Sequence, residues 1–227
     1  MIAGGKEFNT VHDMSGSLTK TLSQLKGKRV GVPRGGSLHD VFLRYYLSRS
    51  GVDNVKIINY DWADLIPHSM ESGEIDAACG TPALAVLLKR LLGAKIIVPP
   101  KMIWPNNPSY GIVTNEEMLK DSRDILTKFL HVHKNACCLE LHERREKSAE
   151  IVAKVVGGLV DSRFVLDVYN ISPKYCAALS SEFVDSTLRM LPVLRELGYL
   201  SGALSKSEIF DFSLIQKVHP EAAHYTS

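Results

Sequence analysis

Residues 34–40, with the sequence RGGSLHD, carry the clearest signal for chemistry in this chain. They join a short apolar strand pattern to an amphipathic helix. Ser37 is a good N-cap, and Asp40, three residues on, completes a capping box. The two glycines let the backbone pass close to a guest, and the first N–H groups of the helix, from Gly36, Ser37 and Leu38, make a cradle for an anion. The alternative is a tight strand-to-helix turn without a ligand, in which Ser37 only caps its helix.

The same loop argues against nucleotide chemistry. A phosphate-binding P-loop requires a lysine after its second glycine, but Ser37 and Leu38 follow Gly36. The dinucleotide fingerprint G-x-G-x-x-G is missing, and so is the nucleophile elbow G-x-S-x-G. We therefore expect a binding protein rather than an enzyme, with no catalytic residue, cofactor or metal.

Two side chains of the loop add chemistry of their own. His39, in the first turn of the helix, is able to contact a sulfonate, a carboxylate or a ring nitrogen, and Arg34 is able to pair with an anion. The alternatives are a packed or solvated histidine and a surface arginine beside a turn.

A second strand-to-helix turn repeats this pattern at residues 79–82. Gly80 ends a short apolar strand, Thr81 is an N-cap, and proline occupies the first helical position. Trp62 and Trp104 flank further loops, and an aromatic wall suits an organic ligand. Packing of these indoles in the core is the competing interpretation.

The elements that position these residues alternate regularly between positions 28 and 113. Strand patterns at 28–33, 55–60, 75–80 and 94–100 alternate with helical patterns. Such alternation predicts an α/β fold with a parallel sheet covered on both faces, whose ligands lie at the carboxyl ends of the strands. The loops at 34–39, 60–62 and 79–81 are predicted to meet at that edge.

From residue 116 onward, long helical patterns replace the alternation. They cover residues 122–143, 147–157, 162–170 and 181–198, and Pro192 lies inside the last of them. The tail after Leu204 is expected to be loosely structured along the surface.

Composition excludes several classes of function. The chain has 227 residues, 45% of them hydrophobic, and a net charge of +2. It has no basic stripe interleaved with aromatic residues, so nucleic acid is not an expected partner. Its apolar runs are too short to span a bilayer, and the first residues do not resemble a signal peptide. The four cysteines form no C-x-x-C pair, so reduced thiols are expected.

Four segments carry a family resemblance. In order and spacing they resemble the sulfonate/nitrate/thiamine-pyrimidine family of type II periplasmic solute-binding proteins of ABC importers. The segments are LKGKRVGVPRGGSLHDVFLRYYL, residues 51–60, ESGEIDAACGTPALAV and WPNNPSYGIVTNEE. The resemblance implies a three-layer parallel-sheet lobe at residues 15–112. It also implies that residues 1–14 and 113–227 form the hinge and a partial, mostly helical first lobe, with Tyr110 on a strand that crosses the hinge.

Compared with that family, the chain begins near the point where its members cross into their second lobe, so half a lobe has no counterpart here. The helical faces that this half-lobe would cover are expected to stay exposed, to self-associate, or to collapse onto the single lobe. Residues expected to lose part of their packing surface are Phe129, Val155, Val165, Leu188 and Leu194.

The resemblance implies a solute-binding component that captures a small organic or oxoanion solute between two lobes and delivers it to an ABC permease. The solute would be a sulfonate, nitrate or a pyrimidine-like compound, and the location periplasmic or extracytoplasmic. Two alternatives stay open. One is a cytoplasmic biosynthetic enzyme of the thiamine-pyrimidine or menaquinone type on the same scaffold, and the other is a sensing or interaction domain.

Overall fold

The chain forms two compact units, which are described separately. The computed structural model describes residues 1–106, 110–137, 144–172 and 176–223. The first unit comprises Met1–Pro105 and Pro192–Ser201, and the second comprises Asn106–Leu191 and Gly202–Ser227.

The first unit is built on a five-stranded sheet with the order β3-β2-β4-β1-β5. Its strands are β1 (Ile2–Gly4), β2 (Arg29–Pro33), β3 (Lys56–Tyr60), β4 (Ala77–Cys79) and β5 (Lys95–Val98). Strands β2 and β3 pair in parallel, and so do β2 and β4. The α/β fold and the four predicted strands are confirmed.

Strand β1 makes the sheet mixed rather than wholly parallel. It pairs antiparallel with β4 on one side and with β5 on the other. Residues 2–4 therefore lie within the sheet, whereas the family resemblance implied that residues 1–14 lie outside the α/β lobe. A three-residue strand with the sequence IAG is too short to show an alternating pattern.

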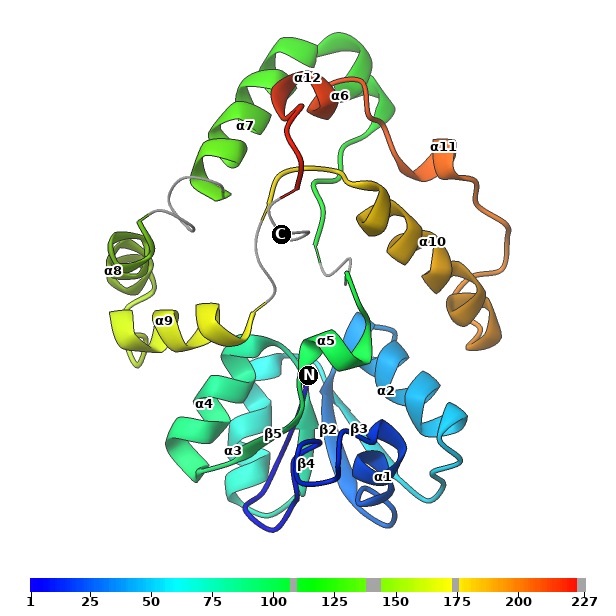
Figure 1. Cartoon of the computed structure of the whole chain (residues 1–227), viewed down its shortest axis with the longest axis vertical. Helices are drawn as coiled ribbons and strands as arrows, with labels where there is room; N and C mark the ends of the chain where they lie inside the picture. Colours follow the sequence, from blue (N-terminus) through cyan, green and yellow to red (C-terminus); the bar gives the residue numbers. More distant parts are fainter. Residues whose placement is uncertain (107–109, 138–143, 173–175, 224–227) are drawn as a thin grey trace. The chain divides into compact units, whose positions relative to one another are not determined.

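Helices cover both faces of this sheet, as predicted. Figure 1 shows α1 (Leu18–Ser23) and α2 (Leu38–Arg49) on one side, and α3 (Ile66–Glu71) and α4 (Pro82–Leu92) on the other. A 3₁₀ turn, η1 (Ala63–Leu65), leads into α3, and the short helix α5 (Pro100–Ile103) follows β5.

The core between these layers is aliphatic. Side chains that are completely or almost completely buried come from both helical layers and from the sheet, among them Leu22, Leu25, Val30, Val32, Leu43, Ile66, Leu88 and Ile97. Burial of this apolar surface is the main stabilising contribution, at about 25 cal/mol per Å².

The second unit is helical in the part that the structure describes. Its helices are α6 (Glu116–Asp121), α7 (Arg123–Asn135), α8 (Arg145–Val156), α9 (Ser162–Ile171), α11 (Lys206–Ile209) and α12 (Ile215–Val218). Helix α10 (Ser181–Glu196) begins in this unit, runs through Pro192, and ends in the first unit. None of the described helices is long and apolar enough to span a membrane.

Of two expectations for this region, one is corrected and the other holds for only some of its residues. Within residues 205–223, the described part of the tail, the short helices α11 and α12 form, and Val218 and His219 are buried, so this part is more structured than expected. Of the residues expected to lose packing partners, Phe129 and Val155 are 51% and 79% exposed, but Val165 is buried and the two leucines are half-buried.

Candidate functional site

The two helix starts singled out in the sequence lie at one edge of the sheet of the first unit. Val30 pairs with Ala77 and Gly31 with Ala78, so β2 and β4 are parallel neighbours whose carboxyl ends point the same way. Helix α2 begins after β2, and α4 begins after β4. This geometry is the predicted one and makes the carboxyl edge the candidate site.

The loop before α2 is held by its own hydrogen bonds. Ser37 Oγ accepts from the backbone N–H of Asp40 (3.4 Å) and donates to the carbonyl of Pro33 (3.0 Å). The N–H of Gly36 donates to Asp40 Oδ2 (3.0 Å). These two groups, predicted to face a ligand, thus stabilise the turn itself.

Asp40 organises this loop. Its side chain is fully buried and also accepts hydrogen bonds from Arg44 Nε (2.9 Å), Asn59 Nδ2 (3.1 Å) and Tyr199 Oη (2.7 Å). Burial alone would raise the pKa of this carboxyl. The hydrogen bonds from Arg44, Gly36, Asn59 and Tyr199 instead hold the pKa below its usual value, so Asp40 is ionised at neutral pH.

Tyr199 was not among the predicted site residues. Its hydroxyl reaches Asp40 across 159 positions of sequence, and its ring lies over Gly36. A Cβ at Gly36 would lie 3.0 Å from Tyr199 Cε1, and Gly36 has φ 78°, so glycine fits this position better than other residues do. No local pattern marks such a long-range contact.

The donors that stay available at the edge are fewer than predicted. The backbone N–H groups of Leu38 and His39, in the first turn of α2, make no hydrogen bond to the described part of the chain. The exposed side chain of Arg34 likewise makes no ion pair or hydrogen bond there. These three groups offer two N–H donors and one positive charge.

His39 is neutral at physiological pH. Burial is the main cause that lowers the pKa of its imidazole to about 4. Its side chain can therefore donate or accept a hydrogen bond at pH 7, but it supplies no charge to an anion.

At the start of α4, Thr81 is exposed and its Oγ1 accepts from the N–H of Leu84 (3.2 Å), as an N-cap does. The N–H of Gly80 donates to the carbonyl of Met1 (3.0 Å) and is thereby engaged. The hydroxyl proton of Thr81 is one donor that this turn presents.

The three aromatic candidates differ in exposure and in location. Trp62 follows β3 and is 72% exposed. Trp104 is only 8% exposed and stacks on Phe42, with ring centroids 5.0 Å apart, so its indole packs against α2. Tyr110 is exposed and belongs to the second unit. Residues 110–115 are not in a strand, and residues 107–109, the rest of the expected crossing strand, lie outside the described residues.

The edge therefore brings together Arg34, the first turn of α2, Thr81 and Trp62 as groups on loops that follow parallel strands. Such a set suits recognition of a polar or anionic solute. No group of three metal-ligating side chains that could hold an ion occurs within the described residues.

Comparison with family models identifies the chain. Residues 6–141, more than half of the sequence, match the model described as NMT1/THI5 like. The chain belongs to this family. No curated protein is similar enough to match it.

Solved structures of binding proteins share the fold. The alkanesulfonate-binding protein SsuA from Xanthomonas axonopodis pv. citri, bound to MOPS, superposes with a TM-score of 0.63 at 15% identity, covering 96% of this chain and 68% of that one. The ligand-binding component of an ABC-type import system from Staphylococcus aureus, with zinc bound, gives 0.72 at 12%, covering 97% and 70%. The periplasmic aliphatic sulphonate-binding protein SsuA from Escherichia coli gives 0.68 at 16%, covering 91% and 63%.

Proposed function

We propose that this chain is a solute-binding component of an ABC importer and captures a small organic or oxoanion solute. A sulfonate is the favoured ligand, and nitrate and a pyrimidine-like compound are the alternatives. The location of the protein is then periplasmic or extracytoplasmic, and its partner is a permease. Its role is binding rather than catalysis. Two of the similar structures are proteins named for binding alkanesulfonates or aliphatic sulphonates.

One observation carries the choice of an anion. At the carboxyl edge of the sheet, the exposed guanidinium of Arg34 adjoins the turn that leads to the N–H groups of Leu38 and His39. The positive end of the α2 dipole favours negative charge at the same place. Trp62, exposed on the loop after β3, offers an apolar surface for an organic substituent.

The test is a thermal-shift screen of alkanesulfonates, nitrate, carboxylates and pyrimidines, followed by calorimetry. A ligand that binds only the folded state raises Tm. We expect Arg34→Ala to weaken binding of an alkanesulfonate by about five- to 150-fold, which corresponds to the roughly 1 to 3 kcal/mol of a charge-assisted hydrogen bond, and to affect a neutral pyrimidine little.

Lys56→Ala is the matched control, because Lys56 is an exposed cation at the amino end of β3, the opposite edge of the sheet. Equal losses in the two variants would mean that only general charge is sensed. A screen in which no anion raises Tm would reject the proposed ligand class.

A further inference from the structure

A cysteine and a histidine of the second unit lie in direct contact. Cys176 Sγ is 3.4 Å from His219 Nε2, and the imidazole is buried at the end of α12. The two residues are 43 positions apart in the sequence, so the fold of the tail creates this pair. A thiol beside an imidazole nitrogen is the arrangement that activates a sulfur nucleophile.

A carboxylate lies beside the histidine, and a lysine binds this carboxylate. His219 Nδ1 lies 3.1 Å from Glu221 Oε2, at ion-pair distance though off the direction of a well-formed hydrogen bond. Lys134 Nζ, from α7, donates to both oxygens of Glu221 (3.0 and 2.8 Å) and to the carbonyl of Val218 (3.0 Å). The hydrogen bond from Lys134 is the main cause that lowers the pKa of Glu221, so the carboxylate is charged at neutral pH.

This order of groups favours one role for each ring nitrogen. A carboxylate beside Nδ1 favours a proton on that nitrogen, which leaves the lone pair of Nε2 facing the sulfur. On the other side of the sulfur, the backbone N–H of Ala178 donates to Cys176 Sγ (3.4 Å). A backbone donor stabilises negative charge on the sulfur.

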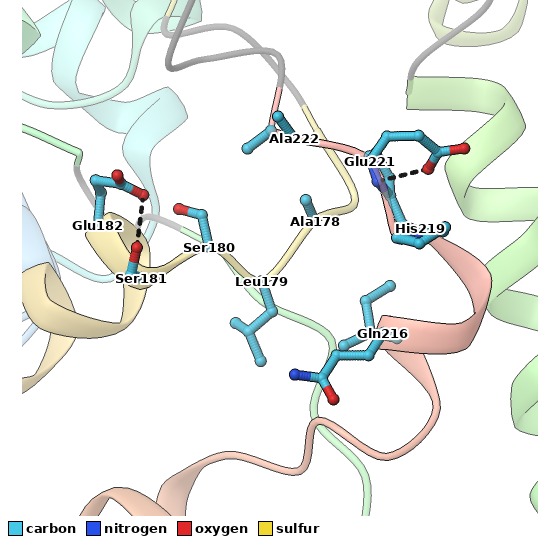
Figure 2. Close-up of a pocket in the computed structure, with 12 residues that line it drawn as sticks. Ala178, Leu179, Ser180, Ser181, Glu182, Gln216, His219, Glu221 and Ala222 are labelled. Carbon is cyan, nitrogen blue, oxygen red and sulfur yellow. Dashed lines mark hydrogen bonds and ion pairs between the residues drawn. The ribbon is translucent and has the colours of Figure 1, made fainter.

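Space for a small molecule adjoins His219. A cavity of about 480 Å³ is bordered by His219 and Glu221 on one side and by the segment that follows Cys176 on the other. Figure 2 shows Ala178, Leu179 and Ser180 on the irregular segment that leads into α10 and borders this cavity, with Gln216 from α12 and His219 from its C-terminal end. Its volume is within the range of cavities that hold small ligands.

We propose that Cys176 is a nucleophilic thiol, activated by His219, that reacts with low-molecular-weight disulfides entering from this cavity. His219 Nε2 takes the proton of Cys176. The thiolate attacks one sulfur of the disulfide, a new S–S bond to Cys176 forms, and the original S–S bond breaks. The leaving thiolate takes the proton back from the imidazolium and departs as a thiol, so Cys176 is oxidised and half of the disulfide is reduced. This modification site is independent of the proposed solute site.

Two other described cysteines serve as internal comparisons. Cys79 is buried in the first unit, and burial raises the pKa of its thiol. Cys137 lies near His133, but at 3.8 and 3.6 Å from the two ring nitrogens, so neither nitrogen is singled out as its partner. Neither has the carboxylate-supported imidazole of Cys176.

The experiment treats the full chain with bis(2-hydroxyethyl) disulfide at pH 6, where ordinary thiols are almost wholly protonated. Modification of each cysteine is followed by peptide mass spectrometry. We expect Cys176 to react first, His219→Gln to slow it about tenfold, and Glu221→Gln to slow it about threefold. His133→Gln is the matched control and leaves the rate at Cys176 unchanged.

Folding is checked by circular dichroism and by an unchanged rate at Cys137. If His219→Gln does not fold, the rate at Cys176 in Glu221→Gln is the test, because Glu221 is exposed. An unchanged rate in that variant overturns the proposal. The proposal is overturned if Cys176 reacts no faster than Cys137 in the unmodified sequence, or if a folded His219→Gln chain keeps the original rate.

Discussion

Asp40 determines which groups at the carboxyl edge remain available to a ligand. Its carboxylate uses the N–H of Gly36 and the hydroxyl of Tyr199, so the glycine cradle is filled from within the protein. Four donors around one buried charge also explain why that charge is tolerated, since an unpaired buried carboxylate would be very costly. In the proposed function, the groups left for a ligand at this edge are Arg34 and the N–H groups of Leu38 and His39 in the first turn of α2.

His39 predicts how stability depends on pH. The pKa of its imidazole is about 4 in the folded chain and about 6.5 in an unfolded one. As the pH falls below 6.5 the unfolded state binds the proton first, so stability declines until the folded form also titrates near pH 4. We expect a loss on the order of 2 to 3 kcal/mol in this window, and none above it.

Urea unfolding measured from pH 7.5 to 4 tests this expectation. His39→Gln removes most of the decline, whereas His68→Gln, on an exposed position of α3, keeps it. The same slope in His39→Gln as in the unmodified chain would show that other groups cause the acid sensitivity.

At the scale of elements, the end of α10 and the turn after it tie a distant part of the sequence to α2. Val193 is buried in the first unit, Arg49 pairs with Glu196 (3.4 Å), and Tyr199 reaches Asp40. The ion pair is exposed and contributes little. The hydroxyl of Tyr199 is therefore the specific polar link.

We expect Tyr199→Phe to lower the free energy of unfolding by about 1 kcal/mol, because it removes one hydrogen bond to a buried carboxylate and retains the ring over Gly36. Tyr60→Phe is the control, since the Tyr60 hydroxyl has no hydrogen bond within the described chain. In a double-mutant cycle with Asp40→Asn, strict additivity would contradict a direct link.

The sequence predicted the elements whose signals are local. Strands β2 to β5 are short apolar runs, and helices α2 and α4 begin at the capping residues Ser37 and Thr81. Strand β1 and helix α12 were not predicted. Segments of three or four residues are too short to show a period of apolar residues, and only strand pairing or packing defines them.

The site was predicted less well, because its geometry depends on contacts far apart in the sequence. RGGSLHD indicates a cap and a turn, but nothing in it shows that Tyr199 covers Gly36. Nor does the sequence distinguish Trp104, which stacks on Phe42, from Trp62, which is exposed. Burial decides whether a tryptophan packs or binds, and burial is a property of the whole fold.

At the scale of the whole molecule, the chain accounts for 68%, 70% and 63% of the three structures it resembles. Its second unit also exposes apolar residues at helical spacing. Ile125, Phe129 and Val132 line one face of α7, and Ile151 and Val155 lie one turn apart on α8. Scattered exposed leucines are ordinary, but stripes of this kind usually mark an interface.

We expect a second copy of the chain to cover the stripe on α8, so that sedimentation velocity shows mass increasing with concentration. Ile151→Glu with Val155→Glu places two charges in the stripe and should reduce association at least tenfold without changing the free energy of unfolding by more than about 0.5 kcal/mol, because both positions are exposed. Leu65→Glu with Leu91→Glu is the matched control, since it adds the same charge at exposed apolar positions of the first unit. A chain that stays monomeric at every concentration, or a control pair that dissociates it equally, would show that the stripe on α8 does not drive self-association.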